Sequence, residues 1–246
     1  ESWSESEIKL STIKLILSTA KPAILPFSDV TASSPYTGYY MGDRIVATDS
    51  YKICGIDIKV FDEAKLLPQA LVNLFDTMTS EDISVKYNDE VVIFSTDDVV
   101  IYGHTHEGIS SFKIDAISSL LDEKFPSSCK IDKSLLTQML DRLSLFVDSL
   151  DKNSVYLTFT KDGLIVSNKR DKGEEIIPYL DSQNFKDYTC CLDIDIFKAQ
   201  VKAYPIDNIE ILYGKNSLKF VTENVKQIVA LADDDRLETD DESDES

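Results

Sequence analysis

The chain has 246 residues, of which 43% are hydrophobic and 28% are charged, and its formal net charge is −19. These values are typical of a water-soluble globular protein with room for two domains, and no apolar run approaches the length that spans a bilayer. The acidic start is not a secretory signal peptide, and an acidic body argues against tight, general nucleic-acid binding over the whole surface. A local basic lining is still compatible with this charge.

The negative charge is concentrated at the C-terminus. Residues 233–246 contain nine acidic residues and one Arg, a net −8, so the remaining 232 residues carry −11. Such a segment has almost nothing to bury, and we expect a disordered acidic tail over 233–246. The polar residues 1–7 are likewise expected to be disordered.

Hydrophobic periodicity predicts four main helices. The longest begins after Asp132, a typical N-cap residue, and places Leu136, Met139 and Leu143 on its buried side. Pro68 interrupts the pattern of the second helix, which therefore starts later or bends there. The predicted helices span Ser11–Lys21, Asp62–Met78, 132–150 and Asp193–Tyr204, and Gly108–Lys124 holds a further strand and a short helical turn.

Alternating apolar and polar residues predict strands between these helices. The clearest case is a hairpin over Val155–Val166, in which Gly163 supplies the turn because glycine adopts positive φ at no steric cost. The other predicted strands are Ile8–Leu10, two or three segments within Gly38–Ile58, Ile83–Tyr87, Val91–Ser95, Val99–Gly103, Glu174–Tyr179, Tyr188–Leu192, Ile209–Tyr213, Ser217–Val221 and Lys226–Leu231.

An internal repeat organises these elements. Ile83–Tyr102 aligns with Ile209–Ile228 at an offset of 126 residues, and both segments contain three strands joined by two short polar turns. Each follows a helix that is itself preceded by strands and an earlier helix. The sequence therefore predicts two similar α+β domains, over residues 8–124 and 125–232.

Several local segments, in this order, resemble the DNA sliding clamps, and most closely the second and third domains of the bacterial DNA polymerase III β subunit. Arg44–Ile53 resembles the family segment that contains Ala-Thr-Asp-Gly-His-Arg-Leu, although Ser50-Tyr51-Lys52 replaces Gly-His-Arg. Phe125-Pro126 followed by Lys130-Ile131 is similar to the Phe-Pro-Asp-Tyr stretch before the last domain. Further similar segments are Arg142–Val147 and Gly173–Pro178, whereas the end Ile228-Val-Ala-Leu-Ala lacks the family's Met-Pro-Met.

The resemblance implies a DNA-clamp fold, with two helices and antiparallel sheets in each domain, that assembles into a ring. Family rings contain six such domains, so the ring would be a trimer if the chain is complete and a dimer if an N-terminal domain is missing. Such a protein is a processivity factor without catalytic activity or cofactor. It would encircle duplex DNA without sequence preference and bind a DNA polymerase and a clamp loader, in the cytoplasm. Bacterial-like sequence in two domains suggests a phage-encoded clamp.

The resemblance also implies two sites. Helices of the family line the DNA channel, where modest positive potential holds phosphates loosely. Candidate DNA-binding residues are therefore Lys14, Lys21, Lys65, Arg142, Lys198 and Lys202. The family's groove for partner peptides, carried over by position, corresponds to Thr48, Ser50, Tyr51, Lys52, Ile53, Pro126, Lys130, Ile131, Ile228 and Ala230. Aliphatic walls with an aromatic rim suit a peptide anchored by Leu or Phe.

Two alternatives to a replication clamp remain open. The first is a clamp-like adaptor or regulator, for example in phage transcription, that keeps the ring fold. The second is a metal-dependent hydrolase that uses His104 and His106, since two imidazoles on one face of an extended segment could bind a metal. No third well-spaced ligand accompanies them. Cys54, Cys129, Cys190 and Cys191 show neither metal-ligand spacing nor disulfide density and are expected to be reduced thiols.

Overall fold

The computed structural model describes residues 2–28, 30–146, 153–168 and 175–232. The chain divides into two compact units. Unit 1 comprises the residues up to Glu123 together with Thr222–Gln227, and unit 2 comprises Lys124–Val221 together with the residues from Ile228 onward. No helix within the described ranges is long and apolar enough to cross a membrane. The predicted acidic tail, 233–246, lies outside the described residues.

The first sheet of unit 1 has the antiparallel strand order β1-β6-β7-β8. These strands are β1 (Ser4–Lys9), β6 (Asp82–Tyr87), β7 (Val91–Ser95) and β8 (Val100–His104). The expected disorder over residues 1–7 is therefore wrong for the start of β1. Its sequence is polar and reads as a solvated peptide, but its backbone pairs with β6, so Ile8 is the one side chain of this strand that is buried.

The second sheet of unit 1 has the order β4-β3-β2-β5. Its strands are β2 (Gly38–Met41), β3 (Ile45–Thr48), β4 (Lys52–Ile56) and β5 (Lys65–Pro68). The strands predicted within Gly38–Ile58 are thus confirmed, with turns at Asp43 and at Asp49-Ser50. The first half of β17, Val225–Gln227, also belongs to unit 1 and follows β4 in the strand order.

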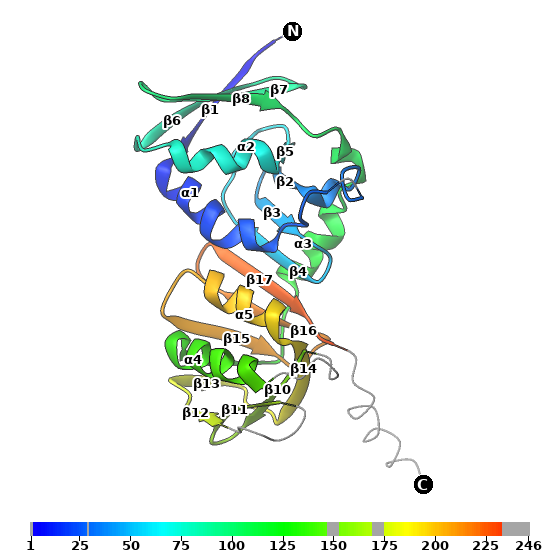
Figure 1. The fold of residues 1–246 in the computed structure, drawn as a ribbon, viewed down its shortest axis with the longest axis vertical. Coiled ribbons are helices and arrows are strands. Elements are labelled where there is room, and N and C mark those ends of the chain that lie inside the picture. The colour runs from blue at the N-terminus through cyan, green and yellow to red at the C-terminus, as the bar shows by residue number, and fades with distance from the viewer. Residues whose placement is uncertain (1, 29, 147–152, 169–174, 233–246) are drawn as a thin grey trace. The chain divides into compact units, whose positions relative to one another are not determined.

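Helices α1 and α2 cover one face of the β1-β6-β7-β8 sheet (Figure 1). The predicted first helix is helical, but a π-helical turn follows its α-helical part. The predicted second helix is wrong before Gln69, because the apolar run before Pro68 forms β5 and pairs with β2. Gly108–Lys124 contains helices and no strand. The helical elements of unit 1 are α1 (Leu10–Leu15), η1 (Ile16–Ala20), η2 (Lys21–Ala23), η3 (Pro35–Thr37), α2 (Gln69–Asn73), η4 (Leu74–Thr77), η5 (Glu107–Ser111) and α3 (Ile114–Asp122).

Unit 2 repeats this plan with two sheets and two longer helices. One sheet has the order β12-β11-β10-β14, and the other has β13-β9-β15-β16, with β17 beside β16. The strands are β9 (Ser127–Asp132), β10 (Ser154–Thr160), β11 (Gly163–Asn168), β12 (Glu175–Ile177), β13 (Asp181–Gln183), β14 (Tyr188–Asp193), β15 (Asn208–Tyr213), β16 (Ser217–Val221) and β17 (Val225–Ala230). The helices are α4 (Lys133–Leu143), η6 (Ser144–Phe146) and α5 (Ile194–Ala203).

The predicted hairpin is confirmed as β10 and β11. Val155, Leu157 and Phe159 are buried, and the residues between them are half-buried. Gly163 has φ +151°, and a Cβ there would lie 2.5 Å from the Ile177 carbonyl oxygen, so glycine is required by both conformation and space. Helix α4 ends earlier than predicted, and residues 147–150 lie outside the described part of the chain.

The internal repeat is visible in the topology of the two units. Shifting β6 and β7 by 126 residues gives the bounds of β15 and β16. The order β1-β6-β7-β8 in unit 1 therefore corresponds to β9-β15-β16-β17 in unit 2, and β4-β3-β2-β5 corresponds to β12-β11-β10-β14. In each unit a helix follows the first strand and another follows the counterpart strands β5 and β14.

Each unit has its own hydrophobic core. Phe61, Phe75 and Phe94 are fully buried in unit 1, as are Phe159, Phe197 and Phe220 in unit 2. The four cysteines are all buried and none of them forms a disulfide bond, as expected for reduced thiols.

Candidate nucleic-acid interface

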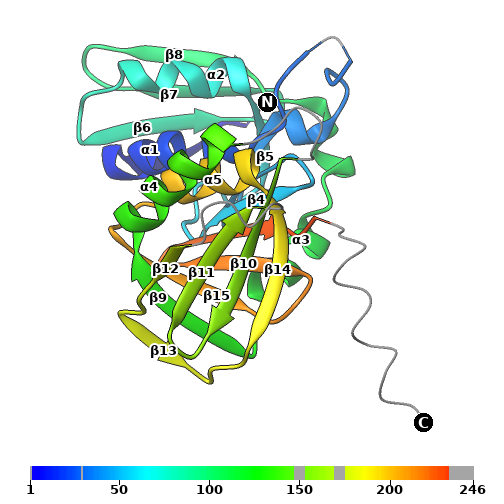
Figure 2. The same cartoon turned by 60° about the horizontal axis from the view of Figure 1, so that its bottom comes forward.

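Helices α4 and α5 of unit 2 lie side by side, as Figure 2 shows. Both begin directly after a strand, and both are N-capped by an aspartate that ends that strand. Asp132 Oδ1 accepts hydrogen bonds from the N–H groups of Ser134 and Leu135, and Asp193 Oδ1 accepts from those of Asp195 and Ile196. These caps satisfy free amides of the first turn and fix where each helix starts.

The lysines predicted on α5 are brought together by one carboxylate of α4. Lys198 Nζ lies 2.7 Å and Lys202 Nζ lies 3.2 Å from Asp141 Oδ1. Lys198 also donates to Ser144 Oγ at 3.1 Å. Hydrogen bonds from Lys198 and Lys202 lower the pKa of Asp141, so the carboxylate is ionised at neutral pH. The cluster of three groups carries a net charge of +1 rather than +2.

The other predicted cation of α4, Arg142, is also paired. Its guanidinium binds both carboxylate oxygens of Glu175 on β12, with Nε 2.8 Å from Oε1. Half of its side chain stays exposed. A planar guanidinium held at two points is a fixed charge, so Arg142 is less free than Lys202 to follow a moving phosphate.

In unit 1 the first helical segment carries two exposed lysines. Lys14 lies on α1 and Lys21 at the start of η2, and neither makes an ion pair with any described residue. The neighbouring helix α2 with η4 exposes Ala70, Asn73 and Asp76 and contains no basic residue. Within the described part of unit 1, Lys14 and Lys21 are therefore the cations of these helices that no carboxylate neutralises.

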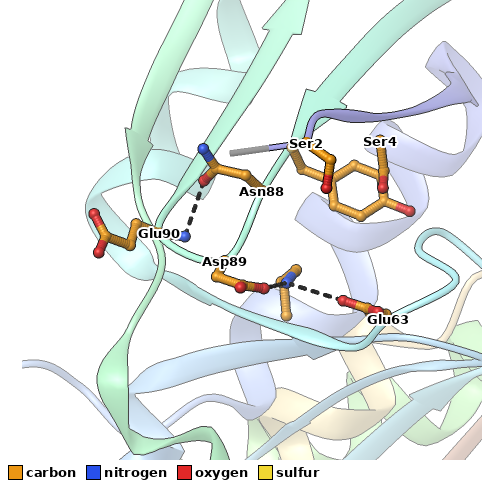
Figure 3. Close-up of a pocket in the computed structure, with 8 residues that line it drawn as sticks. Ser2, Ser4, Glu63, Asn88, Asp89 and Glu90 are labelled. Atoms are coloured by element: carbon orange, nitrogen blue, oxygen red, sulfur yellow. Dashed lines mark hydrogen bonds and ion pairs between the residues drawn. The ribbon is translucent and has the colours of Figure 1, made fainter.

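Lys65 does not lie on a helix, as the sequence suggested. It belongs to β5, its side chain is only 8% exposed, and its Nζ is 3.2 Å from Asp89 Oδ1 and 3.9 Å from Glu63 Oε2. Figure 3 shows these contacts in a cavity of about 370 Å³ lined by Ser2, Ser4, Glu63, Lys65, Tyr87, Asn88, Asp89 and Glu90. Burial and two carboxylates within 4 Å of the ammonium weaken the attraction of Lys65 for a phosphate.

The unit 1 residues predicted for the peptide groove form a rigid turn between β3 and β4. Asp49 Oδ1 accepts from the N–H groups of Tyr51 and Lys52, both at 2.9 Å, and Thr48 Oγ1 donates to the Lys52 carbonyl at 2.8 Å. Lys52 Nζ lies 3.1 Å from Asp49 Oδ2. Ser50 has a positive φ of 81°. The turn therefore presents Tyr51, 64% exposed, while Thr48 and Ile53 are buried.

The unit 2 residues predicted for the groove are placed differently. Ile131 lies in β9 opposite Ile209 and is fully buried in the core of unit 2, so no peptide can reach it. The sequence prediction fails here because it lacks β9, and alternation along that strand sends Ile131 inward and Lys130 outward. Pro126 precedes β9 and packs against Gly214. Ile228 is 5% exposed and Ala230 is half-buried, both on β17.

The histidines do not form a shared metal-ligand pair. His104 ends β8, whereas His106 precedes η5 and its Nδ1 accepts from the Gly108 N–H at 2.9 Å. Its other ring nitrogen lies 3.4 Å from Thr37 Oγ1. Among the residues that the structure describes, no three His, Cys, Asp or Glu side chains are grouped to hold a metal ion.

The bridge from Asp141 to the two lysines is a feature that the sequence does not reveal. Periodicity places Asp141 in the middle of an exposed helix face, and it places Lys198 and Lys202 four residues apart on another helix. Neither pattern shows that these two helices lie side by side. The signal available is the repeat, which implies that the two helices of each unit occupy one layer.

Comparison with known proteins rests on structure. No protein-family model matches the chain, and no curated protein matches its sequence. The fold is similar to that of the DNA polymerase III subunit beta from Borrelia burgdorferi, with 19% identity, a TM-score of 0.79, and coverage of 95% of this chain and 64% of that chain. The fold is also similar to that of the beta subunit from DNA polymerase of Streptococcus pyogenes, with 17% identity, a TM-score of 0.78, and coverage of 93% of this chain and 65% of that chain.

The DNA polymerase sliding clamp from Bacillus subtilis gives 15% identity, a TM-score of 0.79, and coverage of 94% of this chain and 64% of that chain. The chain thus spans just under two thirds of the length of these three proteins. Both units are included in the match, since nearly all of this chain is covered. The resemblance seen in the sequence is therefore confirmed at the level of the fold, and the chain has the sliding-clamp fold of the bacterial DNA polymerase III β subunits.

Proposed function

We propose that this protein is a sliding clamp, a processivity factor without catalytic activity that encircles duplex DNA and tethers a DNA polymerase. The observation that carries the proposal is the match of 95% of the chain, both units included, to the β subunit from Borrelia burgdorferi at a TM-score of 0.79. Tethering makes each rebinding of the polymerase effectively intramolecular, at a high local concentration of primer ends. A clamp loader is the expected second partner, and the cytoplasm the expected site of action.

The DNA-facing surface in this proposal is the helical layer of each unit. Lys14 and Lys21 in unit 1 are exposed and make no ion pair with described residues, and Lys198 and Lys202 in unit 2 share one carboxylate. Few cations on an acidic protein hold phosphates loosely, which a ring that must slide requires. Arg142 contributes less because Glu175 holds it, and Lys65 is excluded by its burial and its acidic surroundings.

Ring closure is proposed to join strand β8 of one copy to strand β12 of the next. Both are edge strands that expose apolar side chains: Val100 is 64% exposed, Tyr102 74% and Ile176 56%. The opposite edge, β1, instead alternates charged residues outward, the usual protection of an unpaired edge. A contact between two different edges is head-to-tail and closes into a ring when the rotation permits.

The internal repeat supports this pairing of edges. β8 is the counterpart of β17, and β12 is the counterpart of β4. Within unit 1, the first half of β17 is the neighbour of β4. The contact proposed between copies therefore repeats a strand pairing that the chain already makes.

Peptide tails of the partners are proposed to bind at the turn Thr48–Lys52, with Tyr51 as the exposed aromatic anchor. The hydrogen bonds of Asp49 and Thr48 hold this turn before any partner arrives, so little ordering entropy is lost on binding. In unit 1, Ile53 remains proposed as part of this site. In unit 2, Pro126, Lys130, Ile228 and Ala230 remain proposed as groove residues.

The proposal is tested by primer extension on a primed circular template and on the same template linearised, with the cognate polymerase and loader. A clamp lengthens the products on the circle and is lost from the free ends of the linear form. Topological retention without any effect on the polymerase would favour the adaptor alternative. The clamp proposal would be overturned if neither the retention of the protein nor the product length differed between the circular and the linear template.

Assembly is tested separately by light scattering. Tyr102→Glu should shift the particle toward the monomer mass, because it places a charge in the proposed strand contact. Phe27→Glu is the matched control, since Phe27 is 63% exposed in the same unit but lies in the loop between η2 and η3 and not on an edge strand. Equal masses for the two variants would remove β8 from the interface.

A further inference from the structure

Asp141 stands between the two lysines of α5, and its position suggests a role in DNA contact that no helix-face pattern reveals. Its Oδ1 lies 2.7 Å from Lys198 Nζ and 3.2 Å from Lys202 Nζ. One carboxylate oxygen therefore serves both ammonium groups. All three side chains remain partly open to solvent: Lys198 is 23% exposed, Asp141 48% and Lys202 51%.

We propose that Asp141 limits the grip of the clamp on DNA by competing with phosphates for Lys198 and Lys202. This inference rests on the proposed function. A phosphate that approaches either lysine must replace an interaction already made and also approach the carboxylate itself. Each such contact is therefore weaker than a contact with an unpaired lysine.

The pair is suited to reversible competition because it is exposed. Ion pairs open to solvent gain little net free energy, so an incoming phosphate can displace the carboxylate without first breaking a strong bond. A buried pair would instead lock the lysines away. Lys202, half-exposed at the C-terminal end of α5, is the group that exchanges more easily, whereas Lys198 is held additionally by Ser144 Oγ.

The two units consequently hold DNA in different ways. Lys14 and Lys21 of unit 1 have no acidic partner among the described residues, whereas Lys198, Lys202 and Arg142 of unit 2 are paired with carboxylates. Unit 1 supplies lysines that a phosphate can bind directly. Unit 2 supplies cations for which a phosphate must compete with a carboxylate. Such a division keeps the total number of strong phosphate contacts small, which favours sliding.

Other charged residues near the cluster do not account for this competition. Asp195 lies on the first turn of α5, where its Oδ2 accepts from Asn153 Nδ2 at 2.9 Å, and it forms no ion pair with Lys198 or Lys202. Glu175 binds Arg142 with both oxygens. Among the residues that the structure describes, Asp141 is thus the carboxylate that pairs with both Lys198 and Lys202.

The test compares Asp141→Asn with Asp195→Asn. Both remove one negative charge from the same pair of helices, but only the first frees the lysines. The equilibrium affinity of the full-length assembly for a linear duplex is measured between low and moderate salt. Asp141→Asn should steepen the slope of log K against log salt by about 0.9 for each additional phosphate that the freed lysines neutralise, whereas Asp195→Asn should leave the slope unchanged.

A second readout follows sliding on DNA. Diffusion of the loaded assembly along a nicked circle should be slower for Asp141→Asn than for Asp195→Asn, with unchanged particle mass and melting temperature for both. Adding Lys198→Met and Lys202→Met to Asp141→Asn should cancel both effects, because the freed charges are then absent.

The failures of the two proposals differ. Equal slopes and equal diffusion for Asp141→Asn and Asp195→Asn would overturn the role of Asp141 while leaving the clamp intact. Asp141→Asn could show the steeper salt slope while the wild-type protein dissociates equally fast from circular and linear DNA. That result would overturn encirclement but keep the competition between Asp141 and phosphates. Absence of any duplex binding by the wild type and by Asp141→Asn would overturn both.

Discussion

The rings of Phe159 and Tyr213 stack in the core of unit 2 with centroids 3.9 Å apart and planes inclined by 11°. Phe159 lies on β10 and Tyr213 on β15, so this contact joins the two sheets of the unit. Phe159→Ala should cost about 3–5 kcal/mol of unfolding free energy, the usual cost of removing a buried phenyl ring. Urea unfolding followed by circular dichroism measures it.

Phe185→Ala is the matched control, because Phe185 lies in the same unit and is 37% exposed. Truncating it should cost less than about 1 kcal/mol. If the two variants lose similar stability, the stacked pair is not the sheet-to-sheet contact that the distances indicate.

Ser50 adopts φ +81°, a conformation that glycine adopts without steric cost. Ser50→Gly should therefore raise the midpoint of urea unfolding, by about 0.5 kcal/mol in free energy after the extra entropy of the unfolded chain is subtracted. Ser50→Val should lower it, because a β-branched side chain is poorly tolerated at positive φ. A lower midpoint for Ser50→Gly than for wild type would contradict this interpretation of the turn.

Burial raises the pKa of the Cys54 and Cys129 thiols to about 12. Because the thiolate is the reactive form, all four buried cysteines should resist an aromatic disulfide reagent at pH 8 and react together when urea unfolds the protein. A thiol that reacts rapidly in the native protein would contradict the placement of that residue.

The same shift predicts alkaline destabilisation. The folded state favours the protonated thiol, so this contribution to stability is complete below the unfolded thiol pKa of about 8.5 and is lost as the pH rises toward 12. Unfolding free energies at pH 7 and pH 10.5 should therefore differ less in Cys54→Ala than in the wild type. An equal difference would show that Cys54 does not titrate with unfolding.

Much of the fold follows from local sequence signals that agree with tertiary structure. The strand sets β6–β7 and β15–β16 are predictable because each alternates cleanly and is bounded by short polar turns, and the same alternation reveals the repeat. The start of α4 is predictable because Asp132 is a cap that acts within three residues. Local chemistry suffices where the partner groups are close in sequence.

The errors concern elements whose identity depends on distant partners. The segment Lys65–Pro68 has a helix-like apolar pattern with the residues that follow, and only pairing with β2 makes it a strand. β1 and β9 are short and polar on one side, so their strand character comes from β6 and β15. For the same reason the sequence misplaces Lys65 and Ile131, and does not reveal the partner of Lys198.

Asp132 Oδ1 accepts from two backbone N–H groups and from the Ser134 hydroxyl, and these bonds, led by Ser134, lower its pKa. Asp132→Ala should cost about 1 kcal/mol at pH 7, the usual value of a lost N-cap. A lowered folded pKa means that the contribution is present above the unfolded pKa of about 3.9 and is lost as the pH falls through the folded value.

Asp132→Asn separates charge from capping, because an amide oxygen still accepts the same bonds. Wild type should exceed Asp132→Asn in stability at pH 6, and the difference should shrink as the pH falls below about 4 in urea unfolding experiments. A difference that is independent of pH would show that the carboxylate charge plays no part in the cap.

Charge reversal of Lys198 and Lys202 tests the helical layer of unit 2 directly. Lys198→Glu with Lys202→Glu should shorten the lifetime of the assembly on circular DNA, because two phosphate-binding cations are removed and Asp141 is left facing two further carboxylates. The slope of log K against log salt should fall by about 1.8 if both lysines contact phosphates.

Lys161→Glu with Lys186→Glu makes the same change in charge at two exposed positions of unit 2 outside the helices, and should leave the lifetime near that of the wild type. Particle mass must stay constant in both variants. Equal lifetimes for the two double variants would remove α5 from the DNA-facing surface, whereas a selective loss would place the duplex against the helices of unit 2.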